Sequence, residues 1–196
     1  MKKNLSLLIV FLFLGFSQFS IAQHKYEREY RIRKVQFPTK ALNYIEKKLS
    51  DAKKVRFYKE TDSAKISYEA KFKKDRLWYS IEFDKEGELE DIEILIQSVE
   101  IPQSSFETIT TYLNTAFKKY RIRKIQQQYP VTDPKNPEKT IKEAFQNLIL
   151  PTINYEFIIS AKKESNFQQY EILFDANGNF KSIRKSLPPN YDHVLY

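Results

Sequence analysis

The chain has 196 residues, no cysteine and a formal net charge of +8, from 33 Lys and Arg against 25 Asp and Glu. The lack of cysteine excludes a disulfide-stabilised fold and a Cys-ligated metal site. The positive charges are interleaved with acids, so we expect no nucleic-acid partner. Thirteen Tyr and fifteen Phe with only three Gly predict a chain rich in strands.

Residues 1–22 have the pattern of a secretory signal peptide. Lys2 and Lys3 precede an apolar run that ends in Ser20-Ile21-Ala22, which predicts cleavage after Ala22. The alternative is an uncleaved N-terminal anchor, but the run is barely long enough to cross a bilayer. We therefore expect a periplasmic or secreted protein, with no stable membrane insertion after cleavage. Cleavage would lower the net charge from +8 to +6, because the segment carries two lysines and no acid.

Two similar segments each begin a helix. Val35-Gln36-Phe37-Pro38 is echoed 64 residues later by Val99-Glu100-Ile101-Pro102, and apolar residues at helical spacing follow both. Proline suits the first turn of a helix, where its missing N–H leaves no bond unmade. The pattern predicts amphipathic helices at about 38–51 and 103–118, the first of them preceded by a strand at 26–36.

Two similar hairpins follow the helices. The segments 79–92 and 170–183 share the pattern Tyr-x-Ile-x-Phe-Asp-x-x-Gly, at an offset of 91 residues. The alternation predicts strands on either side of a turn in which Asp84 and Asp175 bond the backbone and Gly87 and Gly178 adopt a positive φ. These four residues are predicted to be structural.

The offset between the two copies grows along the chain, which locates an insertion. Further strands are predicted at 54–59, 65–73, 92–100, 121–129 and 153–161, and the offset has reached 87 at Tyr68 and Tyr155. The extra residues lie at 130–151 and include a short predicted helix at 137–149. The predicted organisation is a signal peptide at 1–22, a first repeat at 23–101, a second repeat at 102–187 with the insertion 130–151, and a tail at 188–196.

The order of these elements predicts an α+β fold. Two tandem repeats, each a helix followed by antiparallel strands, would form one continuous antiparallel sheet with the helices on one face. The strands alternate apolar and charged residues, so the other face should meet solvent or a partner.

The two hairpins, each preceded by a proline-started helix and two strands, resemble the PepSY-like repeats related to the β-lactamase-inhibitor protein fold. This family is common in secreted proteins of Bacteroidetes-type bacteria, and the likeness covers about 27–186. The resemblance implies helices packed on one side of an antiparallel sheet, no catalytic centre, and a binding or inhibitory role through a variable concave surface. No functional residue can be carried over from such a surface.

The sequence offers little for catalysis or metal binding. His24 and His193 are the only histidines and lie near the ends of the predicted mature chain. The Asp-x-x-Gly turns lack the Gly and Glu positions of a calcium loop. The acids between Glu82 and Glu93 crowd one hairpin and could pair with Lys and Arg on neighbouring strands. We therefore predict no catalytic residue, no cofactor and no metal site.

Two basic segments with interleaved aromatic residues are the candidate partner contacts. Tyr-Arg-Ile-Arg-Lys occurs at both 30–34 and 120–124. Such a pattern fits a track for a polyanion, and it is also the ordinary pattern of an amphipathic strand. The partner-binding candidates, which add three aromatic residues from the predicted strands, are Tyr30, Arg31, Arg33, Tyr68, Phe72, Trp78, Tyr120, Arg121 and Arg123.

The leading functional interpretation is an exported, monomeric, non-catalytic binding or inhibitor-like module that contacts a protein or cell-envelope component through its sheet face. The first alternative is a periplasmic protein that binds a small ligand or a polyanion. A hydrolase is the second alternative, and it would need a cleft with convergent titratable groups.

Overall fold

A computed structural model describes residues 23–25, 27–62, 65–163 and 166–186. Within them ten strands form one sheet in the order β1-β10-β9-β8-β7-β6-β5-β4-β3-β2. The strands are β1 (Gln23–Lys25), β2 (Glu27–Ile32), β3 (Lys53–Asp62), β4 (Lys65–Lys74), β5 (Leu77–Asp84), β6 (Leu89–Ile96), β7 (Tyr120–Pro130), β8 (Asn154–Lys163), β9 (Asn166–Asp175) and β10 (Phe180–Ser186). The predicted signal peptide and tail lie outside the described residues.

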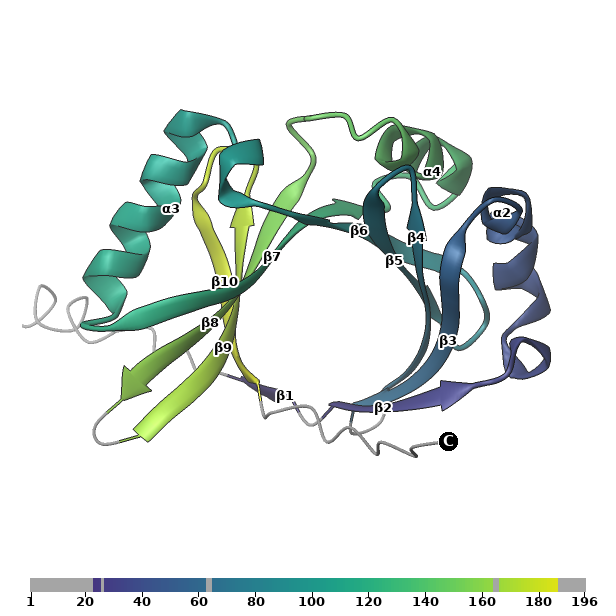
Figure 1. Cartoon of the computed structure of the whole chain (residues 1–196), viewed down its shortest axis with the longest axis horizontal. Coiled ribbons are helices and arrows are strands. Elements are labelled where there is room, and N and C mark those ends of the chain that lie inside the picture. The colour runs from purple at the N-terminus through teal and green to yellow at the C-terminus, as the bar shows by residue number, and fades with distance from the viewer. Residues whose placement is uncertain (1–22, 26, 63–64, 164–165, 187–196) are drawn as a thin grey trace, which may run out of the picture.

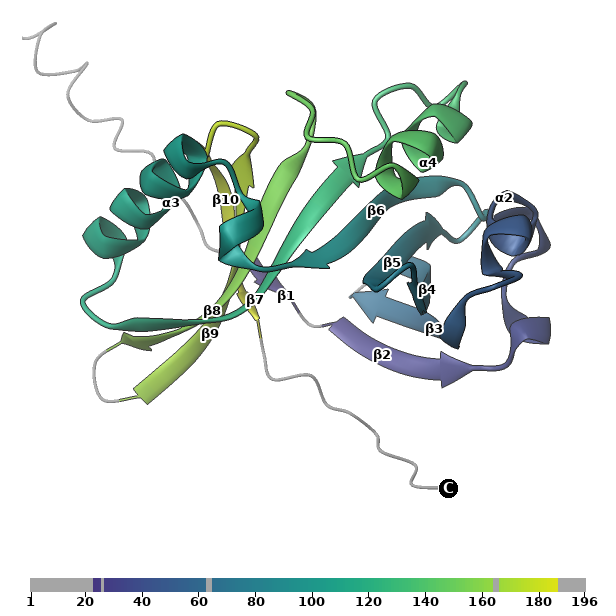
Figure 2. The same ribbon diagram turned by 45° about the horizontal axis from the view of Figure 1, so that its top comes forward.

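Three helices cover the outer face of this curved sheet. They are α2 (Thr39–Leu49), α3 (Gln103–Ala116) and α4 (Pro137–Phe145), and both views show them outside the ring that the strands describe (Figures 1 and 2). The α+β prediction, with two repeats sharing one sheet and helices on one face, is confirmed. No helix among the described residues is long and apolar enough to cross a membrane.

The N-terminal strand differs from its prediction. Instead of one strand over 26–36, β1 pairs in parallel with β10 and β2 pairs antiparallel with β3. Because only residue 26 separates β1 from β2, the two edges of the sheet are formed by consecutive stretches of chain (Figure 1). Residues 34–36 form a 3-10 turn, since the amide of Phe37 donates to the carbonyl of Lys34 at 3.1 Å.

The two repeats agree in their hydrogen bonds. Each helix is preceded by a 3-10 turn, η1 (Lys34–Gln36) or η2 (Ser98–Glu100), whose last side chain accepts a bond from the backbone three residues earlier. In each hairpin turn the glycine amide donates to the carbonyl of the aspartate three residues earlier, at 3.0 Å for Gly87 and 2.9 Å for Gly178. Their φ angles are +81° and +85°, which only glycine adopts without strain.

The hydrophobic core lies between the helices and the outer face of the sheet. Phe72, Phe83, Phe157 and Phe174 are fully buried there because alternate strand residues point toward the helices. Helix α4, in the predicted insertion, packs Phe145 on Tyr79 with ring centroids 4.8 Å apart. It ends four residues before the predicted end, because Asn147 turns the chain with a φ of +50°.

Candidate functional site

The inner face of the curved sheet, opposite the helices, is acidic. It surrounds a cavity of about 460 Å³ whose lining includes ten Asp and Glu against five Lys and Arg. The same alternation that sends Ala70 and Phe72 of β4 toward the core sends Ser67, Glu69 and Lys71 into this cavity. The cavity therefore has a charge opposite to the +8 of the whole chain.

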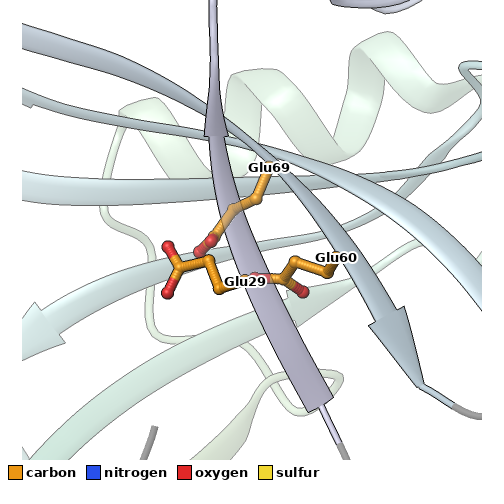
Figure 3. Close-up of side chains that lie close together, drawn as sticks. All are labelled: Glu29, Glu60 and Glu69. Atoms are coloured by element: carbon orange, nitrogen blue, oxygen red, sulfur yellow. The ribbon is translucent and has the colours of Figure 1, made fainter. Parts of the chain in front are cut away.

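Three carboxylates converge at one side of the cavity, and two of them pair with one lysine. Glu29 of β2, Glu60 of β3 and Glu69 of β4 lie close together (Figure 3). Each places a carboxylate oxygen within 4.8 Å of the other two. The Nζ of Lys71 lies 2.7 Å from Oε2 of Glu69 and 2.9 Å from Oε1 of Glu29. We call Glu29, Glu60 and Glu69 the paired triad, because a lysine ammonium already neutralises part of its charge.

The pKa values in the paired triad follow from that lysine. Burial alone would raise the pKa of Glu69, but the charge and hydrogen bond of Lys71, together with hydrogen bonds to Glu60 and Ser80, outweigh burial and hold that pKa below its usual value. For Lys71, burial acts to lower the pKa, and Glu69 and Glu29 outweigh it, so the pKa is raised. Glu69 and Lys71 are therefore both charged at neutral pH.

A second convergence of carboxylates has a different environment. Glu82 of β5 and Asp91 and Glu93 of β6 also place oxygens within 4.8 Å of one another, and Glu82 lies directly opposite Asp91 in the strand register. We call these three residues the open triad. Within the part of the chain that the structure describes, no Lys or Arg forms an ion pair with Asp91 or Glu93.

Burial and like charge raise the pKa of both acids on β6 in the open triad. Burial contributes most at Asp91 and at Glu93, and Glu82 is the next contributor at each. Two amides of β7 bond to them: Nε2 of Gln128 donates to Oδ2 of Asp91 at 3.0 Å, and Nε2 of Gln126 donates to Oε2 of Glu93. Burial and the neighbouring acids therefore favour the protonated forms of Asp91 and Glu93.

Two oxygens beside the open triad are buried without a hydrogen bond. They are Oδ1 of Asp91 and the amide oxygen Oε1 of Gln126, whose residue is only 5% exposed. Buried oxygens normally accept a bond, and each exception calls for an explanation.

The crowd of acids on the β5–β6 hairpin was predicted to pair with neighbouring bases, and the structure divides it. Glu88 pairs with Lys40, and Oε1 of Glu90 lies 2.7 Å from Nζ of Lys65. The acids of the open triad on β6 face the cavity instead. The alternation of residue types along each strand predicts which side chains share a face. The curvature that brings residues of β2 to β10 around one cavity depends on the tertiary structure.

Beside the acidic cavity, the inner face has an apolar and basic groove. A hollow of about 410 Å³ is lined by Trp78, Leu95, Arg76 and Arg123, among others. Trp78 is 37% exposed and Leu95 is 43% exposed. The ammonium groups of Lys54 and Lys73 lie 5.4 Å and 6.0 Å from the centre of the Trp78 ring system.

The predicted partner contacts are only partly accessible. Phe72 was a candidate and is wrong as a surface contact, because it is fully buried and stacks on Tyr79 with centroids 5.4 Å apart. Tyr68 is half-buried against the core, with its ring edge-on to Phe37. Tyr120 is also half-buried, and its hydroxyl donates to Asn114. The exposed candidates are Tyr30, Arg31, Arg33, Trp78, Arg121 and Arg123.

The two basic segments do not form one surface. Residues 30–34 lie on β2 and the turn after it, and 120–124 lie on β7, with four strands between them in the sheet. Of the four exposed candidate arginines, only Arg123 lines the cavities of the inner face. A continuous polyanion track is therefore not formed by these segments. His24 lies in β1, and His193 lies outside the described residues.

Comparisons with known structures identify the fold. A DUF2874 family protein from Bacteroides ovatus ATCC 8483 has 9% identity and a TM-score of 0.50, with 76% of this chain and 87% of that chain covered. A protein from Bacteroides eggerthii DSM 20697 that is proposed to be periplasmic has 14% identity, a TM-score of 0.50, and coverage of 76% and 88%. A BLIP-like protein from Bacteroides fragilis NCTC 9343 has 11% identity, a TM-score of 0.46, and coverage of 81% and 92%.

A comparison with protein-family models gives no match, and neither does one with curated protein sequences. The resemblance drawn from the two hairpins is thus confirmed as a likeness of fold. This chain shares its fold with the DUF2874 family protein from Bacteroides ovatus and with the protein from Bacteroides eggerthii.

Proposed function

We propose that this protein is an exported, non-catalytic binding module that holds a basic segment of a partner protein against the inner face of its sheet. The observation that supports this most is the charge of the inner cavity, ten acids against five bases in a chain whose net charge is +8. Complementary charge gives such a surface specificity and a fast association rate. The neighbour proposed to be periplasmic supports the expected location.

The groove beside the cavity supports a protein as the partner. Trp78 and Leu95 offer exposed apolar area next to the acids, and aromatic side chains in such settings often dominate binding energy. A partner strand or loop with alternating basic and apolar residues would fit both parts of the inner face. The polyanion alternative loses support, because the largest hollow on this face is acidic.

The proposal is tested with a fluorescent peptide of alternating Arg and Leu, measured by anisotropy against the purified chain. A matched peptide with Glu in place of Arg is the control ligand. We expect saturable binding of the Arg peptide that weakens as salt rises, because salt screens accessible charges. Equal binding of both peptides would contradict the proposal.

A pair of variants locates the contact. Trp78→Ala should weaken binding by at least about fivefold, the loss typical of an aromatic contact that matters. Val99→Ala is the matched control, since Val99 is 83% exposed on the turn before α3 and away from the inner face. If both variants bind alike, the groove is not part of the binding surface.

A further inference from the structure

The groove and the acidic cavity of the inner face adjoin each other. Arg123 and Lys124 of β7 line both hollows. Along β6, Leu95 lines the groove and Glu93 lines the cavity, two residues apart on the same face of the strand. Two residues of a strand span about 7 Å. One extended segment of a partner can therefore contact both hollows.

The charge of the groove is opposite to that of the cavity. The lining of the groove contains three bases, Arg76, Arg123 and Lys124, and one acid, Glu100. The carboxylate of Glu100 already accepts a hydrogen bond from the backbone amide of Gln97 at 2.7 Å. Within the described ranges, neither Arg76 nor Arg123 forms an ion pair. The groove therefore favours a negative charge on its occupant, whereas the cavity favours a positive one.

Apolar surface lies between these two arginines in the order of the strands. Arg76 belongs to the turn that joins β4 to β5, and Arg123 lies on β7. Trp78 near the start of β5 and Leu95 on β6 line the same hollow. The groove thus combines apolar contact area with two guanidinium groups, which bind carboxylates through paired hydrogen bonds.

The C-terminal residue of a peptide carries both groups that this groove favours. Its side chain and its carboxylate leave the same Cα atom, so an apolar group and a negative charge reach adjacent positions. An acidic residue inside an extended segment lacks this property, because the side chain of its apolar neighbour points to the opposite face. Capture of a C-terminal carboxylate is a recurring mode of peptide recognition.

We propose that the groove binds the C-terminal residue of the partner protein. The apolar side chain of that residue lies on Trp78 and Leu95, and its carboxylate pairs with Arg76 and Arg123. Basic residues that precede it in the partner reach the acids of the cavity, of which Glu93 is two residues from Leu95. The inference rests on the proposed function, because it names which part of the basic partner segment the inner face holds.

The test compares two forms of the alternating Arg–Leu peptide, both labelled at the N-terminus and ending in Leu. One form has a free C-terminal carboxylate and the other has a C-terminal amide. We expect the free form to bind at least about fivefold more tightly in the anisotropy assay, because hydrogen bonds to charged groups are strong. The amidated form carries one more positive charge, so attraction to the acidic cavity alone would give the opposite order.

Arginine variants locate the carboxylate. Arg76→Gln and Arg123→Gln should each reduce the preference for the free form toward equal binding of the two forms. Both arginines are exposed, so the melting temperatures of the variants should match that of the wild type. Arg28→Gln is the matched control, because Arg28 is exposed and lines neither hollow, and this variant should keep the full preference.

The proposal is overturned if the amidated form binds as tightly as the free form, or more tightly. It is also overturned if the preference is the same in Arg76→Gln, Arg123→Gln and the wild type. An amidated peptide with Glu in place of the last Leu tests the other source of a carboxylate, and binding of this peptide as tight as that of the free form would overturn the choice of a C-terminus.

These outcomes separate the inference from the proposed function. A chain that binds both forms of the Arg–Leu peptide equally well retains the proposed function and loses only the C-terminal site. A chain that binds neither form loses both.

Discussion

Substitution of the two turn glycines by alanine tests how the hairpins are fixed to the helices. Gly87 and Gly178 occupy equivalent turns with φ angles of +81° and +85°, where a residue with a Cβ loses about 1–2 kcal/mol. The surroundings differ. A Cβ at Gly178 would lie 2.3 Å from the carbonyl oxygen of Ser105 in α3, whereas at Gly87 its nearest contacts are at 3.1 Å, with Ala41 and Pro38.

The contact at Gly178 involves backbone, so the turn or the start of α3 must move. That movement also strains the bond from Oγ of Ser105 to the carbonyl of Ala176, now 2.8 Å long. We expect Gly178→Ala to cost about 3–4 kcal/mol of unfolding free energy and Gly87→Ala about 1–2 kcal/mol. The assay is equilibrium urea unfolding of both variants and the wild type. Equal costs at the two glycines would refute the argument from close approach.

Three further predictions concern the triads and the insertion. The unfolding free energy should fall as pH rises above about 4 and through the raised pKa of Glu93. In this pH range the folded chain keeps a proton on Glu93 that the unfolded chain has released. Glu93→Gln should flatten this pH dependence in urea titrations, and an unchanged dependence would contradict the raised pKa of Glu93. Lys71→Met should lower the unfolding free energy by about 2–3 kcal/mol, because the substitution leaves Glu69 buried without its cation. The loss is smaller than for a fully buried pair, because Lys71 is partly exposed. No change in thermal unfolding would show that the Lys71–Glu69 pair does not stabilise the fold. Phe145→Ala should lower the unfolding free energy by about 2 kcal/mol, because it removes the ring stacked on Tyr79. In this variant the amide hydrogens of α4 should exchange faster than those of other elements. Equal protection of α4 and the other elements would show that other contacts hold α4 in place.

The periodic parts of this fold could be predicted from the sequence. The helices and the hairpins around Gly87 and Gly178 follow from local patterns, so α2 and α3 begin within one residue of the predicted positions. The repeat also predicted that both copies would share one sheet. The split of the N-terminal segment into β1 and β2 was not predicted, because it depends on the sheet curling until its edges meet.

The candidate site was harder to predict than the fold. Phe72 was a candidate contact as an aromatic residue of a predicted strand, and the alternation of Lys71, Phe72 and Lys73 did not say which face the helices would cover. In the structure Phe72 is fully buried on the covered face. The acids of β5 and β6 were expected to find bases across the strands. The strand register differs from that expectation, because it places Asp91 directly opposite another acid, Glu82.

The two faces of the sheet have different roles in this account: the outer face stabilises the fold, and the inner face is proposed to bind. The outer face holds the core with the helices, so its residues are not available to a partner. The inner face does not contribute to the hydrophobic core. It carries buried acidic side chains, which are unfavourable in a hydrophobic core. Buried like charges reduce stability, which is consistent with the proposal that this face binds a partner of opposite charge.

Amide chemical-shift mapping of the labelled chain with the Arg–Leu peptide tests this account most directly. The account predicts the largest shifts on β5, β6 and β7, including Glu93, Leu95 and Trp78, with small shifts on α2 and α3. It also predicts that the Glu–Leu peptide leaves the spectrum unchanged. Shifts confined to the helices, or equal shifts with both peptides, would contradict the claim that the acidic inner face is the binding surface.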